Sequence, residues 1–147
     1  MPATTPAATT PKPVPTKAVF IAQADEICRA GNAELAPFKR RSKALAGDSP
    51  AEIRELLPPI LRQAVVVERA WIAKLQALPT PSGDATTIAK WLTALNEAMT
   101  DARSVADAVE AEGLAAQQPA TSAGEKAKTL ARGLAQGYGM KVCGKSE

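Results

Sequence analysis

The residues of this chain that could do chemistry are two cysteines, two tryptophans, one basic run and scattered carboxylates. Histidine is absent, and with it the commonest general base and the commonest metal ligand. Carboxylates do not replace it, because a di-metal site inside a helical bundle also needs inward Glu-x-x-His pairs. Glu97 and Asp101, one helical turn apart, are expected on the outer face of their helix. We therefore expect no enzyme activity, no metal and no cofactor.

The two cysteines, Cys28 and Cys143, lie near opposite ends of the chain. If the chain folds back at turns near residues 48, 81 and 117 with the usual helical rise, Cys28 lies level with about residue 140. This register and the even cysteine count favour a Cys28–Cys143 disulfide. Such a bridge is worth about 4 to 5 kcal/mol on the chain-entropy model. The alternative is two unrelated buried thiols in a cytosolic protein.

The same register places Trp71 and Trp91 at one level, on either side of the turn near residue 81. As candidate ligand contacts, they would form an aromatic wall between the helices. As structural residues, they would fill one layer of the core. The second interpretation is favoured.

The basic run Lys39-Arg40-Arg41-Ser42-Lys43 is the only charge cluster. Its four cations are candidate anion-binding residues, suited to the phosphates of a nucleic acid or to an anionic surface polymer. Cations in the last turns of a helix also interact favourably with its dipole, so a solvated helix end is the favoured interpretation. A net charge of +3 is small for a dedicated nucleic-acid binder. The sequence does not identify the partner, and an envelope protein and an anionic surface polymer are the two candidates.

The elements that must position these residues are helices. Hydrophobic residues make up 46% of the chain and aromatic residues only 3%, so alanine and leucine must form the core. Apolar periodicity predicts helices over about 17–46, 50–78, 84–112 and 122–139. Capping boxes are expected to begin the second helix at Ser49 and the fourth at Ser122, Asp84 is the expected N-cap of the third, and Gly113 ends it. Pro37 should kink or divide the first helix, and Pro58 and Pro59 should bend the second. Short connections predict an all-α, antiparallel up-down four-helix bundle over residues 17–147.

Residues 1–16 form a Pro/Thr/Ala tail, which we expect to be a disordered linker. It has neither the charged n-region nor the apolar h-region of a signal peptide. Such tracts are typical of a spacer behind a cleaved signal or a membrane anchor, although an ordinary chain terminus is the alternative. No transmembrane segment is expected, because the longest aliphatic run is residues 64–67.

Two stretches carry a resemblance: FIAQADEIC at residues 20–28, followed by Asn32, and YGMKVCG at residues 138–144. They resemble the F-x-x-x-A-x-x-I-C start and Y-G-x-x-x-C-G end of a group of uncharacterised actinobacterial alanine-rich helical proteins, secreted or membrane-anchored. The resemblance spans about residues 19–144, but only its two ends are specific. It implies an extracytoplasmic bundle with a Cys28–Cys143 pair, and it implies no activity.

These observations favour a non-catalytic extracytoplasmic helical module with a binding or structural role in the cell envelope. One alternative is a bundle that binds a small apolar ligand between its helices. Another is a cytosolic nucleic-acid or adaptor protein that uses the basic helix end.

Overall fold

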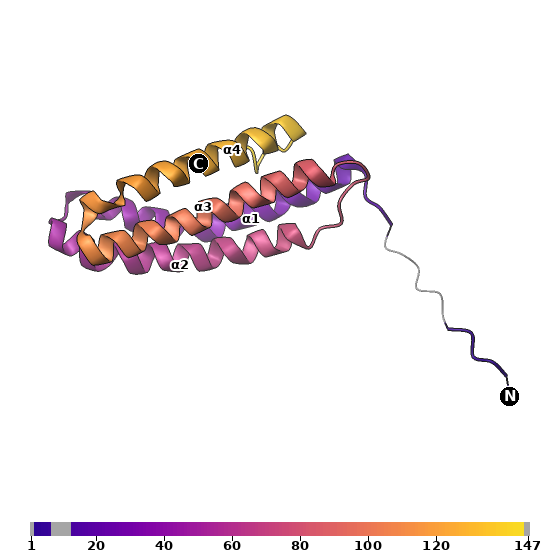
Figure 1. Ribbon diagram of the computed structural model, residues 1–147, viewed down its shortest axis with the longest axis horizontal. Helices are drawn as coiled ribbons and strands as arrows, with labels where there is room; N and C mark the ends of the chain where they lie inside the picture. Colours follow the sequence, from indigo (N-terminus) through magenta and orange to yellow (C-terminus); the bar gives the residue numbers. More distant parts are fainter. Residues whose placement is uncertain (1, 7–12, 146–147) are drawn as a thin grey trace.

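The computed structural model describes residues 2–6 and 13–145. It is an antiparallel up-down-up-down bundle of four helices: α1 (Lys17–Ala44), α2 (Pro50–Gln76), α3 (Ala85–Glu112) and α4 (Gln118–Tyr138) (Figure 1). Two short 3-10 helices, η1 (Leu45–Gly47) and η2 (Leu114–Gln117), lead into α2 and α4. The predicted all-α four-helix bundle is confirmed, and the described residues contain no strand.

Two of the predicted helix ends are confirmed. Ser49 Oγ accepts the N–H of Glu52 at 3.3 Å, and the Glu52 carboxylate accepts the N–H of Ser49 at 3.1 Å, which forms the capping box. At the end of α3, Gly113 adopts a φ of 92°, a conformation that glycine tolerates best. The guanidinium of Arg54 donates to two carbonyls of the last turn of α3, at 2.9 and 2.6 Å, and so ties α2 to that end.

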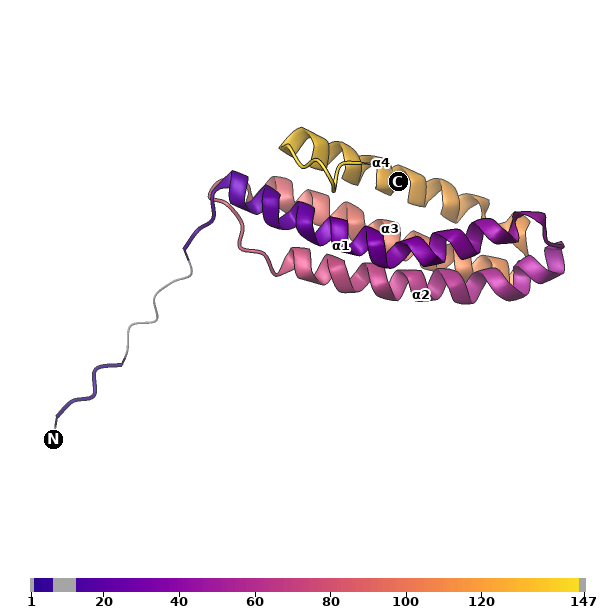
Figure 2. The same cartoon turned by 180° about the vertical axis from the view of Figure 1, so that it is seen from behind.

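One other predicted boundary needs correction. The helix α4 begins at Gln118, one turn before Ser122, because η2 runs directly into it and Pro119 fits its first turn. The helix α1 runs unbroken through Pro37, and Figure 2 shows its axis bending in the half that leads to η1. The helix α2 likewise continues through Pro58 and Pro59.

The core is built largely from small residues, as the low aromatic content predicts. Alanines from α1, α3 and α4 pack with a few large side chains in the main cluster: Phe20, Ala24, Cys28, Leu75, Ile88, Trp91, Ala94, Ala131, Ala135, Tyr138 and Met140. A smaller cluster comprises Ile72, Ala98, Met99 and Ala127. Trp71, partly buried, packs against both clusters and so links them.

Three pairs of neighbouring helices pack closely, whereas α1 and α4 lie farther apart and meet only through side chains. The helices pack in sequence order, α1 on α2, α2 on α3 and α3 on α4. Along α1 and α4, both described in full, no Cα atom of one helix lies within 8 Å of a Cα atom of the other. We call this gap the open edge. Gly124 of α4 faces α3, where a Cβ at this position would lie at contact distance, 3.4 Å, from the Cβ of Asp101.

The predicted disordered linker at residues 1–16 lies partly outside the described residues, namely at residues 1 and 7–12. Residues 2–6 and 13–16 have no regular secondary structure, and most of them are exposed. None of the helices in the described part of the chain is long and apolar enough to cross a membrane.

The position of Trp71 depends on Gly31 of α1, which leads to a prediction. A Cβ at Gly31 would lie 2.7 Å from Cδ1 and 2.8 Å from Cγ of the Trp71 indole. We expect Gly31→Ala to destabilise the protein by about 1–3 kcal/mol in urea unfolding, because the ring or the helix must move.

The control is Gly133→Ala in α4, where a new Cβ would meet nothing within 4 Å. Helix propensity alone should make that variant more stable by about 0.5–1 kcal/mol. If Gly31→Ala also stabilised the protein, the close contact between α1 and Trp71 would be refuted.

Candidate functional site

The segment after α4 turns sharply at Gly139. This residue adopts a φ of 102°, and its N–H donates to the carbonyls of Ala135 (3.1 Å) and Gln136 (3.0 Å). The N–H of Met140 also donates to Ala135, at 2.9 Å, which completes a Schellman motif. The chain then folds back along α4 (Figure 2), with the Met140 side chain buried in the core. This reversal delivers residues 141–143 to the open edge.

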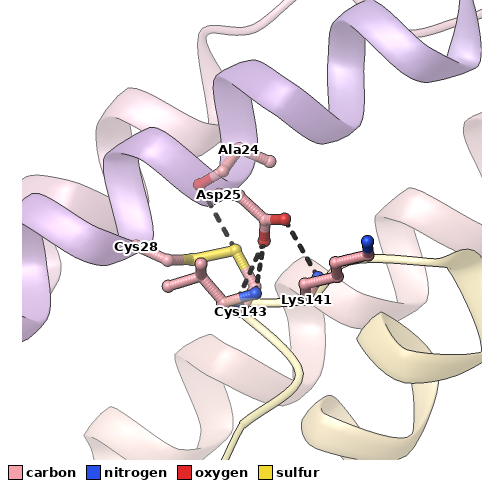
Figure 3. Close-up of a disulfide and its surroundings, with 6 residues drawn as sticks. Ala24, Asp25, Cys28, Lys141 and Cys143 are labelled. Atoms are coloured by element: carbon pink, nitrogen blue, oxygen red, sulfur yellow. Dashed lines mark hydrogen bonds between the residues drawn. A yellow bond between two sulfur atoms is a disulfide. The ribbon is translucent and has the colours of Figure 1, made fainter.

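At the open edge, Cys28 of α1 and Cys143 form a disulfide across a sequence separation of 115 residues, with their Cα atoms 5.4 Å apart. The pairing expected from the helical register is therefore present, and Cys28 is almost fully buried. Figure 3 shows the bridge beside the Ala24 carbonyl, whose oxygen lies 3.3 Å from the Cys143 sulfur. An oxidised sulfur has no hydrogen to donate, so this is a packing contact.

Asp25 of α1 holds the same segment by hydrogen bonds. One carboxylate oxygen accepts the N–H of Lys141 at 2.9 Å, and the other accepts those of Val142 (2.9 Å) and Cys143 (3.0 Å), as Figure 3 shows. Asp25 is the one buried charged residue of the described chain. Three converging N–H groups compensate for the cost of burying it. We call Asp25, the disulfide and residues 141–143 the C-terminal clasp.

The clasp gives a prediction for Asp25→Asn. The amide keeps one acceptor oxygen but replaces the other with an NH2 group, which leaves a backbone N–H facing a donor. We expect a loss of about 1–3 kcal/mol in the free energy of unfolding of the oxidised protein. The neighbouring Glu26→Gln is the control, because Glu26 is exposed and pairs only with Arg29 at the surface, so it should change stability by less than about 1 kcal/mol. Equal stability of the two variants would contradict the role of Asp25.

Tyr138 closes the end of the open edge where α1 begins. Its ring packs edge-on against Phe20 at 5.9 Å, and the Lys17 ammonium lies 4.5 Å from its centroid. Its hydroxyl donates to a carboxylate oxygen of Asp84 at 2.5 Å. Asp84 is at the predicted N-cap position of α3, but its side chain makes no cap and binds Tyr138 instead. Burial first, and then the hydrogen bond and charge of Asp84, raise the pKa of Tyr138 to about 12.

This pKa can be measured directly, because Tyr138 is the only tyrosine. Near-ultraviolet titration should give a pKa of about 12 in the folded protein and the ordinary value of about 10 after denaturation. Since the folded pKa is the higher one, this contribution to stability is complete below about pH 10 and is lost as the pH rises through about 12. Asp84→Asn should lower the pKa but leave it above 10, since burial remains. An ordinary pKa in the folded protein would refute the buried pair.

Beyond the clasp, the open edge becomes a half-open cleft of about 180 Å³. All four helices and the clasp contribute to its walls. The apolar part of the lining consists of the disulfide with Leu35, Trp71, Leu95, Ala98, Met99, Ala131 and Val142. The polar part consists of Asn32, Lys39, Glu68, Lys128, Arg132 and Lys145.

The charge of the cleft is unbalanced. Its lining carries four cations, Lys39, Lys128, Arg132 and Lys145, and a single carboxylate, Glu68. Burial raises the pKa of Glu68 above its ordinary value, and the positive charges of Lys128 and Lys39 partly offset the effect. The cleft therefore combines an apolar floor with an excess of positive charge.

The candidate site residues from the sequence lie in different parts of the structure. Trp71 lines the cleft, whereas Trp91 is only 2% exposed, belongs to the main core cluster and does not line it. Both indole N–H groups are buried without a hydrogen-bond partner among the described residues, so this feature does not distinguish the cleft from the core. Within the basic run, only Lys39 reaches the cleft. Arg40, Arg41 and Lys43 are exposed on the last turns of α1, with Arg41 stacked near Phe38 at 5.7 Å.

Several residues of the clasp and the cleft were not predicted from the sequence. Asp25 gave a signal, since it lies between Ala24 and Cys28 on the face predicted to be apolar, where a carboxylate needs partners. No sequence signal marks Glu68, Lys128 or Arg132, because each is an ordinary charged residue of an amphipathic helix. Only the open edge brings them together.

Groups of three or more potential metal-ligating side chains are absent from residues 2–6 and 13–145. No family model, curated protein or solved structure matches the chain, so the proposals below depend on its own geometry.

Proposed function

We propose that this protein is a non-catalytic helical module that works outside the cytoplasm, secreted or anchored at the cell envelope, where it binds other molecules or has a structural role. The observation that carries the proposal is the C-terminal clasp. The disulfide is integrated into the fold, because the adjacent amides are held by a buried carboxylate.

The chemistry of the bridge supports the proposed compartment. Disulfides persist in oxidising compartments and are rare in the reducing cytosol. A bridge that closes a loop of this length stabilises a fold by about 4 to 5 kcal/mol on the chain-entropy model. An alanine-rich core with few large side chains gains much from that contribution. The Pro/Thr/Ala tail, typical of a spacer, supports the same proposal.

A second candidate function is the binding of a small apolar ligand between the helices. The cleft favours it, because Trp71, Leu95 and Met99 line a cavity that opens to solvent beside the clasp. The two candidates are compatible, since a clasped bundle outside the cytoplasm can carry a binding cleft.

The proposed compartment can be tested in the cells that produce the protein. Thiols are blocked by alkylation at the moment of lysis, and the fractions are then analysed by intact mass with and without reduction. We expect the protein in the extracytoplasmic fraction, with Cys28 and Cys143 unlabelled until the disulfide is reduced. A Cys28→Ser/Cys143→Ser variant gives the reference mass without labels. Protein confined to the cytosol with both thiols labelled would overturn the proposal.

A further inference from the structure

The size of the cleft limits its ligand. A cavity of about 150 Å³ is large enough to hold benzene, and this cleft measures about 180 Å³. Its volume therefore suits one aromatic ring or a short alkyl group, and most of a lipid acyl chain would extend beyond it into solvent. Leu35, Ala98 and Met99, each no more than 5% exposed, form a dry surface for that group. The indole of Trp71 adds a flat face.

The positions of the charges around the cleft limit the ligand further. Lys128 and Arg132 are one turn apart on α4, Lys39 is on α1 across the open edge, and Lys145 follows the clasp. Cations therefore surround the cleft from three separate segments. Glu68 is the single carboxylate among the lining residues, and Glu125, which does not line the cleft, pairs with Lys128 at 4.0 Å. A ligand with one negative charge would complement this arrangement, whereas a cation would meet repulsion on all sides.

We propose that the cleft at the open edge binds a small organic anion, an aromatic or short-chain carboxylate, with its apolar group against Trp71 and Met99 and its carboxylate toward Lys128 and Arg132. The inference rests on the second function proposed above. It names the ligand class that the cleft selects. The clasp forms one wall, so an intact disulfide is required for the full site.

The test is calorimetric titration of the oxidised wild-type protein with three ligands of equal size. Phenylacetate carries the negative charge, phenylacetamide is its neutral counterpart and phenethylamine carries a positive charge. We expect phenylacetate to bind most tightly and phenethylamine not to bind. Equal binding of phenylacetate and phenylacetamide would overturn the anion assignment but leave an apolar site in place. If none of the three bound, the ligand site would be refuted, whereas the proposed compartment would be unaffected.

Variants then locate the site. Lys128→Gln/Arg132→Gln should weaken phenylacetate binding about tenfold. Glu68→Gln should strengthen it, because it removes the opposing carboxylate. Lys126→Gln on α4, which does not line the cleft, is the matched control and should change nothing. If the control lost as much affinity for phenylacetate as the double variant, the assignment of the site to the cleft would be overturned.

Two further measurements keep the proposal testable without charge variants. Phenylacetate should change the emission of a Trp91→Phe protein, whose remaining indole is Trp71, and leave that of Trp71→Phe unchanged. The reverse pattern would place the ligand elsewhere. If Trp91→Phe does not fold, chemical-shift mapping on the wild-type protein gives the same comparison of the two indoles.

A long-chain fatty acid that bound far more tightly than phenylacetate would overturn the size argument and indicate a lipid site.

Discussion

The structure depends on one cross-connection, the clasp that joins the C-terminal segment to α1 through the Cys28–Cys143 disulfide and the Asp25 carboxylate. The Cα atoms of α1 and α4 stay more than 8 Å apart, so these two helices meet only through side chains, such as those of Phe20 and Tyr138, and through the clasp. The two parts of the clasp act differently. The disulfide restricts the unfolded chain, while the carboxylate pairs amides that would otherwise be buried without acceptors. Together they allow a bundle with an alanine-rich core to leave one edge unpaired.

That unpaired edge is the origin of the cleft. A symmetric bundle would have filled the space between α1 and α4 with interdigitated side chains. Here α4 packs closely on α3 and not on α1, and Tyr138 and the clasp close only one part of the space between α1 and α4. The remaining space is lined by the apolar floor and by charged residues at its rim. Stability and the proposed binding therefore have the same structural cause, since the clasp that holds this edge together is also a wall of the cleft.

The sequence predicted the architecture well, since apolar periodicity and the Ser49 capping box are local signals that the tertiary structure does not override. The disulfide was also predictable, because antiparallel helices of similar rise fix the register of distant residues. The cleft was not, because periodicity reports which face of a helix is apolar and not how far apart two helices lie. The start of α4 was predicted one turn late, at Ser122. The side chain of Asp84 was predicted to cap α3, whereas it accepts a hydrogen bond from Tyr138. Both errors reflect polar side chains whose partners are distant in the sequence.

The most direct test of this account is amide hydrogen exchange at Lys141, Val142 and Cys143, before and after reduction of the disulfide. The account predicts protected amides in the oxidised protein, although the segment belongs to no helix, because all three donate to Asp25. Reduction should increase their exchange strongly while the amides of α2 and α3 stay protected. Fast exchange at these positions in the oxidised protein, or unchanged protection after reduction, would contradict the clasp as the feature that holds the open edge.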